Sequence, residues 1–334
     1  MKKETFRLST RKLLGLCTVT LLVLLLCFPK ASLNGAEQGI MLWFNVIFPT
    51  LLPFIIVSRL IISLKLTTYI AKVFYPFLHR LFGVTKHGCY VVIIGMLTGY
   101  PVGAKSSADL VKEGLISREE GQYLLNFCNN ASPMFIISYI AITTLNVPGD
   151  KYLFLALLYG SAILTGFLYR FTHNLSGTTL ESLLSSKHSN NLSITCITPT
   201  QRKKNRISFA TRDTAIMEGF DVLTRVGGYI VLFSIVSSII LSVLPTNSIG
   251  GYIVVCLLEI TNGVNAVGVA SLPLTIKIAL ILSLTAFGGL SSVAQTKSVI
   301  DESGLSIKSY IFYKLLNAGI TLVLVTTYLQ LSNR

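Results

Sequence analysis

Residues 98–107 read Thr-Gly-Tyr-Pro-Val-Gly-Ala-Lys-Ser-Ser and directly follow an apolar run. Gly99 and Gly103 permit backbone conformations that other residues rarely adopt, and Pro101 lacks a backbone donor and disfavours helix in Tyr100. A helix that enters this stretch is therefore expected to end there, and a second half-helix is expected to begin near Ala104. Since lipid leaves no room for unpaired backbone groups, we interpret such a break as a functional feature.

A similar break late in the chain indicates an internal repeat. Residues 39–47 match residues 215–223 at an offset of 176 (216 − 40), and the breaks match at 190, so the second half is expected to carry an insertion of 14 residues (190 − 176). Two interrupted apolar segments in corresponding halves point to a transporter binding site. The offset of 190 aligns Gly99 with Gly289, Ala104 with Ala294, Gly114 with Gly304, Leu115 with Leu305, Tyr123 with Tyr313 and Leu125 with Leu315.

The composition identifies a polytopic membrane protein. Hydrophobic residues make up 52% of the 334 residues and charged residues only 13%, with a mean hydropathy of +0.68, which is too apolar for an ordinary soluble domain. The net charge of +14 comes from basic clusters between apolar runs. Such clusters set the orientation of a protein in the membrane. We therefore expect the lipid bilayer as a partner and no nucleic-acid partner.

The sequence does not predict an enzyme. Its six cysteines and four histidines are scattered without metal-binding spacing, and no nucleophile–base pair or pair of carboxylates is evident outside scattered loops. Residues 103–106 lack the Gly-Lys-Ser/Thr order of a nucleotide-binding loop. We therefore expect no metal and no cofactor, and we leave open a coupling ion or proton. The oligomeric state is not predicted.

Hydropathy divides the chain into four parts. Residues 1–36 form a basic segment and a first transmembrane helix, which we interpret as retained rather than cleaved as a signal peptide. Residues 37–172 form a first repeat with a re-entrant hairpin at 88–116. A basic loop at 173–212 is expected on the cytoplasmic side, and residues 213–334 form a second repeat with a broken helix or hairpin at 251–308. The long apolar segments lie at about 39–63, 120–145, 151–171, 214–244 and 309–329, and the interrupted ones at about 69–84, 88–111, 251–268 and 274–300.

The repeats are expected to have inverted topology. If 88–116 dips into the membrane and returns, the first repeat crosses three times, and an odd number of crossings inverts the second. Residues 251–290 leave two possibilities, two full crossings or a pair of half-helices. The predicted fold is thus an all-α polytopic membrane protein with an inverted-topology repeat and two re-entrant or broken-helix hairpins.

The breaks predict a site for an anion. A helix amino terminus attracts carboxylates or phosphates, and Lys105 would add a full charge; Lys105 snorkelling to the interface is the structural alternative. The amides near Pro133 either bind a ligand or bond across helices. Glu259 is a possible cation or proton site, a partner for Lys105, or an interfacial residue. The candidate binding residues are Gly99, Tyr100, Gly103, Lys105, Ser106, Ser107, Asn129, Asn130, Ser132, Glu259, Thr261, Asn262, Gly288, Gly289, Ser291 and Gln295.

Four strings in this chain resemble the sporulation integral membrane protein YlbJ family, also called stage V sporulation protein SpoVV, whose members carry the Gate or nucleoside-recognition type of domain. These strings occupy residues 98–105, 125–133, 258–263 and 287–291, and the resemblance covers roughly residues 10–330. It implies a membrane around the developing forespore and transport of dipicolinic acid towards the spore. Gate domains also occur in nucleoside transporters.

Three functions follow as expectations. The first is alternating-access transport of a small organic anion, most plainly dipicolinic acid. The second is a cation-coupled nucleoside permease with the same fold. The third is a non-transporting assembly protein of the spore membrane, in which the polar residues at the breaks only hold helices together.

Overall fold

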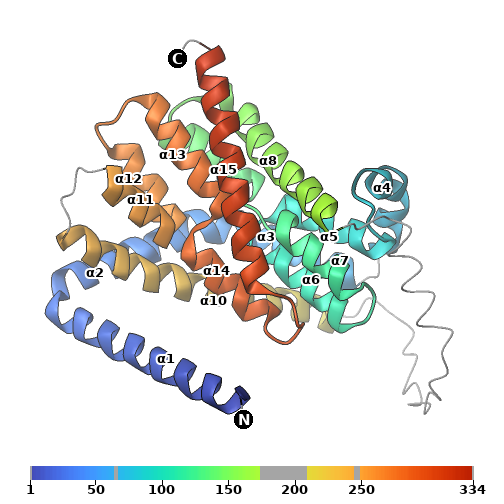
Figure 1. Cartoon of the computed structure of the whole chain (residues 1–334), viewed down its shortest axis with the longest axis horizontal. Helices are drawn as coiled ribbons and strands as arrows, with labels where there is room; N and C mark the ends of the chain where they lie inside the picture. Colours follow the sequence, from blue (N-terminus) through green and yellow to red (C-terminus); the bar gives the residue numbers. More distant parts are fainter. Residues whose placement is uncertain (1, 64–66, 174–208, 244–248, 333–334) are drawn as a thin grey trace.

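The computed structural model describes residues 2–63, 67–173, 209–243 and 249–332 (Figure 1). These residues contain helices and no strand, which confirms the all-α prediction. The predicted cytoplasmic loop at 173–212 falls mostly outside the described residues, so its side of the membrane stays a prediction.

Several helices are long and apolar enough to cross a bilayer, whose core needs about 20 apolar residues. Four helices meet this requirement singly. Two pairs of helices meet it only when the two members are taken together, and the members are bent by 107° in one pair and 90° in the other. The protein is therefore an integral, multi-pass membrane protein with four to six spans in the part of the chain that the structure describes. The single spans are Pro148–Thr172, Gly219–Val243, Leu274–Ile300 and Ile307–Leu331, and the bent pairs are Thr18–Cys27 with Pro29–Ile47 and Lys72–Phe82 with Lys86–Thr98.

The described part of the first half holds ten helical elements besides a single 3-10 turn, and that of the second half holds six. The first ten are α1 (Lys2–Cys27), α2 (Pro29–Leu42), η1 (Trp43–Ile47), α3 (Phe48–Ser63), α4 (Thr67–Phe82), α5 (Lys86–Thr98), α6 (Val102–Lys112), α7 (Arg118–Cys128), η2 (Phe135–Thr144) and α8 (Lys151–Thr172), with a short turn η3 (Pro148–Asp150) before α8. The last six are α10 (Phe209–Val243), α11 (Ile249–Leu258), α12 (Ile260–Val269), α13 (Leu274–Phe287), α14 (Gly289–Ile300) and α15 (Ile307–Leu331).

Two pairs of short helices form hairpins. α5 packs against α6, and α11 packs against α12. α11 and α12 have 10 residues each, so each is about 15 Å long at 1.5 Å per residue, half of a bilayer core of about 30 Å. Residues 249–269 are therefore a pair of half-helices, whereas the rest of the segment 251–290 belongs to α13, which is part of a candidate span.

Two further helices are broken without folding back. α7 and η2 are separated by the non-helical residues 129–132, and α13 and α14 meet at Gly288. In neither pair do the two helices pack extensively against each other, and α13 and α14 together are long and apolar enough to form one span. Each half thus contains one hairpin followed by one broken helix.

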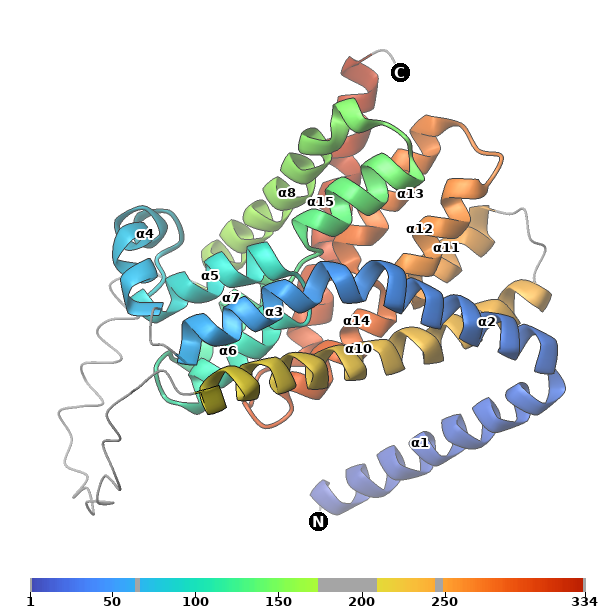
Figure 2. The same cartoon turned by 180° about the vertical axis from the view of Figure 1, so that it is seen from behind.

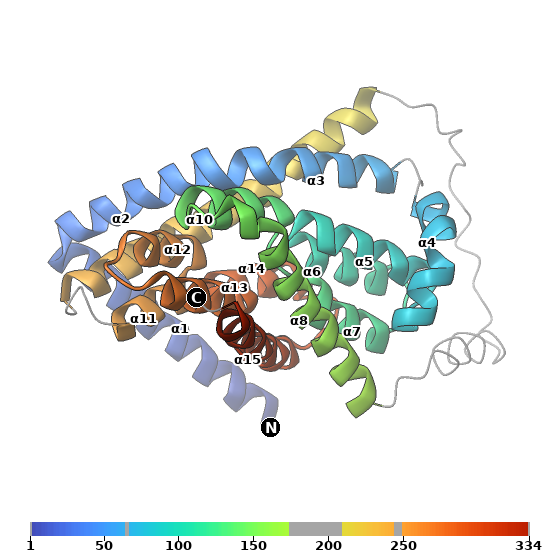
Figure 3. The same cartoon turned by 90° about the horizontal axis from the view of Figure 1, so that it is seen from above.

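The two halves run in opposite directions. α2 and α3 lie antiparallel to α10, and α8 descends where α15 ascends (Figures 1 and 2). From above, α13 and α14 lie in the middle of the assembly, with α2 and α3 along one edge and α4 at one end (Figure 3). This arrangement has the opposite orientation of halves that the sequence predicted.

The correspondence between the halves differs from the predicted one. The offset of 190 aligned the hairpin α5–α6 with the broken helix α13–α14, whereas the order of elements pairs α5–α6 with α11–α12 and α7–η2 with α13–α14. A glycine inside an apolar run ends a helix in both kinds of element, so the local pattern could not tell a hairpin from a broken helix. The match of residues 39–47 with 215–223 agrees with the pairing of α2 and α3 with α10.

Candidate functional site

All four breaks in the helices line one pocket, which we call the central pocket. Its volume is about 30 Å³, room for one or two water molecules, so in this structure the pocket is too small for an organic solute. The hairpin tips and the broken helices supply most of its wall, and α10 and the start of α3 complete it. The lining residues are Ile47, Leu51, Gly99, Tyr100, Ala131, Ser132, Phe135, Val226, Ile230, Glu259, Ile260, Thr261, Gly288, Ser291, Ser292 and Gln295.

Glycines let each hairpin tip pack onto the broken helix of its own half. Gly99 has φ +83°, and a Cβ there would lie 2.8 Å from the Ser132 nitrogen. Gly289 has φ +80°, and a Cβ there would lie 3.2 Å from the Cys256 oxygen. Side chains rarely adopt such φ values, so the sequence can place the four breaks together only with glycine at these positions.

Donors from other elements satisfy the carbonyl groups that the first broken helix exposes. The Tyr100 backbone nitrogen donates to the Asn130 oxygen at 2.8 Å. The Lys314 ammonium donates to the Asn129 oxygen at 3.2 Å, and the Tyr159 hydroxyl to the Ala131 oxygen at 3.2 Å. Since unpaired backbone groups are costly in lipid, these three bonds from α5–α6, α8 and α15 hold the break open as irregular backbone.

Asn129 joins three elements at this break. Its side-chain oxygen accepts from the Ala104 backbone nitrogen at 3.3 Å, and its amide nitrogen lies 2.9 Å from both the Thr296 and Tyr310 hydroxyls. Asn130 donates to the Phe127 oxygen at 2.6 Å. Both amides are buried and do not line the central pocket, so in this conformation they bond across helices, which is the alternative to ligand binding.

Glu259 provides the charge of the central pocket. It is 3% exposed and is the one charged side chain among the described residues that line the pocket. Its carboxylate accepts from the Asn262 backbone nitrogen at 2.7 Å, as the N-cap of α12. Within the described residues it forms no ion pair with Lys105, because Lys105 pairs with Asp109.

Lys105 lies outside the central pocket. Its side chain is 31% exposed, 3.2 Å from the Asp109 carboxylate, and it lines a larger cavity of about 630 Å³. The prediction that Lys105 and Gly288 face one ligand together is therefore not met in this conformation. Lys105 lies about one turn into α6, beyond the tip of the hairpin. The backbone amide of Ala104, which was expected to bind the anion, donates to the Asn129 side chain instead.

The larger cavity, which we call the vestibule, adjoins the central pocket. Gln295 and Val226 line both cavities. The remaining walls carry charges of both signs on α6, α10 and the residues after α14. The vestibule residues are Pro101, Lys105, Asp109, Lys112, Asp221, Val222, Arg225, Val226, Tyr229, Gln295, Ser298, Val299, Asp301 and Glu302.

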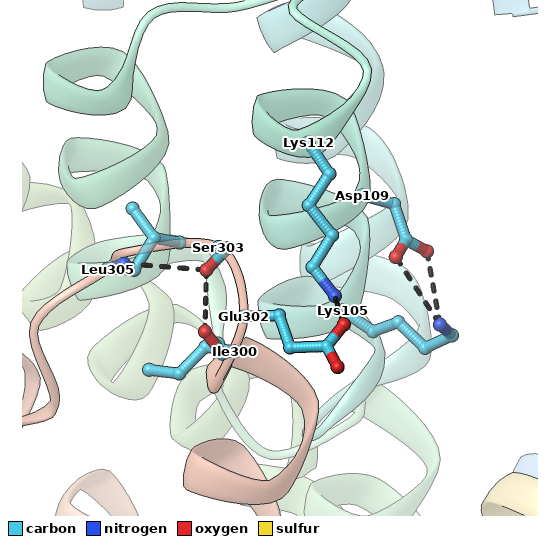
Figure 4. Close-up of polar contacts among 7 residues, drawn as sticks. All are labelled: Lys105, Asp109, Lys112, Ile300, Glu302, Ser303 and Leu305. Atoms are coloured by element: carbon cyan, nitrogen blue, oxygen red, sulfur yellow. Dashed lines mark hydrogen bonds and ion pairs between the residues drawn. The ribbon is translucent and has the colours of Figure 1, made fainter.

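One ion pair joins α6 to the residues after α14 at the vestibule rim, as Figure 4 shows. The Lys112 ammonium of α6 lies 3.1 Å from the Glu302 carboxylate beyond α14. Lys297 pairs with Asp301, and this hydrogen bond and charge hold the pKa of the Asp301 carboxyl below its ordinary value. The pair of Lys112 and Glu302 is exposed, and such a pair contributes about 0–1 kcal/mol, so it can separate at little cost if α6 moves relative to α14.

The other predicted binding residues fall into two groups. Tyr100, Ser132, Thr261, Gly288, Ser291 and Gln295 line the central pocket with Gly99 and Glu259. The second group serves the packing around it. A Cβ at Gly103, which lies inside α6, would be 2.6 Å from the Cys128 oxygen. On the same helix Ser106 is buried and Ser107 donates to the Gly103 oxygen. In the second half Asn262 donates to Ser234, and Gly289 contacts the tip of the hairpin α11–α12.

Sequence reasoning missed Lys314, Tyr159 and Tyr310, which support the first broken helix. Lys314 could have been found, because it is a lysine inside the apolar segment 309–329 and such residues are expensive in a membrane. The tyrosines carry no comparable signal. In the described part of the chain, no three His, Cys, Asp or Glu residues are grouped to hold a metal ion.

Comparison with known proteins finds a relative among sporulation proteins. The chain is 27% identical over 320 residues to the sporulation integral membrane protein YlbJ of Bacillus subtilis (strain 168), a match that covers 89% of this chain and 77% of that protein. No family model matches the chain, and no solved structure matches it.

Proposed function

Because similarity over 89% of its length supports the assignment of this chain to the YlbJ family of sporulation integral membrane proteins, we propose that it acts in sporulation by moving a small organic solute across a membrane. The solute would bind in the central pocket and reach each side in turn as the two halves rock. This mechanism is alternating access around a fixed site at the midplane.

The observation that carries this proposal is the meeting of four helix breaks at one pocket. Non-helical backbone within a bilayer is tolerated where protein buries it or where it lines a cavity. A protein that only needed to hold helices together would require no such convergence. The vestibule next to the central pocket supports one stage of the cycle, in which a solute could enter the vestibule while the central pocket is too small to hold it.

Dipicolinic acid, the cargo that the family resemblance implies, is our first candidate. In the vestibule its two carboxylates would meet Lys105, Lys112 and Arg225, but the same walls carry four carboxylates, so the vestibule does not by itself favour an anion. In the central pocket the carboxylates of dipicolinic acid would face Glu259, and like charges at close range oppose binding. A dianion therefore requires Glu259 to be protonated or to hold a cation when the dianion binds.

A neutral nucleoside is the second candidate, and Glu259 is the observation that favours it. The described lining offers a carboxylate, an amide and several hydroxyls but no cationic side chain. Such groups hydrogen-bond to sugar hydroxyls and base edges at no cost in charge repulsion.

Uptake into proteoliposomes tests the proposal and separates the two cargoes. Radiolabelled dipicolinate and uridine are offered to wild type, to Glu259→Gln and to a control, Glu302→Gln. Glutamine keeps an oxygen for the Asn262 nitrogen, so the cap of α12 survives. A hydrogen bond to a charged group contributes about 1.5–3 kcal/mol, so Glu259→Gln should raise the KM for a nucleoside about 10-fold or more.

For dipicolinate the same substitution should instead lower the KM, because it removes a like charge. Glu302 is 86% exposed at the vestibule rim, so its substitution should change either KM less than threefold. If neither compound nor a wider panel of aromatic dicarboxylates and nucleosides enters the vesicles, while Glu259→Gln only lowers protein abundance, the assembly role is the better interpretation.

A further inference from the structure

Lys314 is a buried cation that the proposed solute pathway does not use. It lies in α15, is 1% exposed and is not among the residues that line the central pocket. Within the described chain no carboxylate lies within 4.0 Å of its ammonium group. An ionisable residue inside a membrane span is expensive and is a functional hypothesis by default.

The two partners of this ammonium are neutral oxygens at the first broken helix. Lys314 Nζ lies 3.2 Å from the Asn129 carbonyl oxygen and 3.1 Å from Asn130 Oδ1. The two oxygens belong to the first and second residues after Cys128, the last residue of α7. The carboxyl end of a helix carries partial negative charge and unsatisfied carbonyl groups, so the ammonium lies where a cation is most favoured.

These two oxygens are of the kind that contribute to coupling-ion sites. In transporters with broken helices, unwound carbonyl groups and the carboxyl ends of half-helices coordinate sodium ions. Here the same break is also bonded to the hairpin tip, since the Asn130 oxygen accepts from the Tyr100 nitrogen. A cation at this point therefore helps to fix the wall of the central pocket.

α15 contacts the second broken helix through a neutral donor rather than a charged one. Asn317, one turn beyond Lys314, donates its amide to the Ala286 oxygen near the end of α13 at 3.4 Å. The same helix thus supports both breaks, with a charged donor at the first and a neutral donor at the second. The charge at the first break is accordingly a specific feature of that break.

We propose that the Lys314 ammonium is a tethered cation that takes the place of a coupling ion at the carboxyl end of α7, so that the first broken helix is assembled without sodium. The role in transport rests on the proposed function, whereas the cation site itself does not. Lys314 is by this argument a positioning residue. Removing its side chain should leave a site that a free cation can fill.

Thermal unfolding of the purified protein tests this proposal without reference to any solute. Lys314→Ala removes three methylene groups and the ammonium, which propylammonium reproduces in size and charge. We expect this variant to unfold at lower temperature than wild type. Propylammonium should raise its Tm by about 3 °C or more, whereas neutral propanol should not, and wild type should respond to neither and not to the replacement of potassium by sodium.

Two further variants serve as controls. Lys314→Met fills the space with an apolar chain and should be destabilised without any response to propylammonium. Lys308→Ala changes an exposed lysine of the same helix and should behave as wild type. Equal rescue of Lys314→Ala by propylammonium and propanol, or a sodium response in wild type, would overturn the proposal.

A variant that keeps Lys314 covers the case in which Lys314→Ala does not fold. Asn130→Asp places a carboxylate at the position of Oδ1, 3.1 Å from Nζ in the present structure. Because Asn130→Asp also loses the donation to the Phe127 oxygen, its reference is Asn130→Ala, which loses the same bond. With a charged ammonium we expect Asn130→Asp to have a higher Tm than Asn130→Ala, and with an uncharged amine a lower one. Because the readout is Tm, a protein that transported none of the tested solutes would refute the proposed function and leave this result standing.

Discussion

Replacing Gly103 with alanine should loosen the packing of the first hairpin on the end of α7. Gly103 lies inside α6, and the Cys128 oxygen approaches it so closely that an ideal Cβ would lie 2.6 Å from that atom. Ordinary contacts begin near 3.4 Å, so helix and oxygen must separate by 0.8 Å (3.4 − 2.6). The neighbour is backbone and cannot rotate away.

Two opposing effects set the size of this change. Overpacking of this kind costs about 1–3 kcal/mol, and we expect the upper end because the obstacle is a backbone atom. Alanine gains about 1 kcal/mol over glycine within a helix. The net destabilisation for Gly103→Ala is therefore about 2 kcal/mol, a difference of the two estimates.

Gly319→Ala is the matched control. Gly319 is also helical, lies in α15 and has no neighbour within 4 Å of an added Cβ, so the control should be stabilised by about 1 kcal/mol. Differential scanning fluorimetry should separate the two variants by about 6 °C, at about 2 °C per kcal/mol for a chain of this size. Equal Tm values would refute the close approach of α6 to the end of α7.

Other substitutions test further contacts of the site. Gly289→Ala should lower the Tm by several degrees, because a left-handed backbone costs about 1–2 kcal/mol with a side chain, whereas Gly250→Ala, with nothing within 4 Å, should not; equal values would contradict the described turn at Gly289. Tyr159→Phe should destabilise by about 1–3 kcal/mol, since its hydroxyl bonds to the Met96 and Ala131 carbonyls; the exposed Tyr152→Phe is its control, and a stable variant would remove α8 from the support of the break. Lys112→Ala should shift the Tm by less than the equivalent of about 1 kcal/mol because the pair with Glu302 is exposed, and a larger loss measured by fluorimetry would show that this pair locks the vestibule.

Much of the architecture follows from local chemistry and was therefore predictable. Glycine and proline near Tyr100 and the glycine pair at Gly288 each mark a break, and both breaks were expected from the residue types alone. Glu259 was expected as a functional carboxylate in an apolar run, and the structure brings it and both breaks to one pocket.

The parts that escaped prediction depend on contacts between distant segments. Lys105 was expected at the ligand because it follows the break, but the rotation of α6 directs it to the vestibule and to Asp109. The cation that reaches a break is Lys314, 185 positions beyond its partner Asn129. Neither the rotation of a half-helix nor the partner of a buried lysine can be read from spacing along one chain.

The amides at the first broken helix show the same limit. Asn129 and Asn130 were predicted as either ligand groups or bonds between helices, and their residue type permits both. In this conformation Asn129 and Asn130 bond between helices, because Thr296, Tyr310 and Lys314 lie within hydrogen-bond distance of their side chains.

Labelling of one cysteine in the central pocket, from each side of the membrane, tests alternating access most directly. In a protein whose six native cysteines are replaced, Ser291→Cys is exposed to a membrane-impermeant thiol reagent added to one face or the other of oriented vesicles. We predict labelling from both sides, at rates that a transported solute changes in opposite directions. Labelling from one side only, with or without solute, would contradict a pocket that opens to each side in turn.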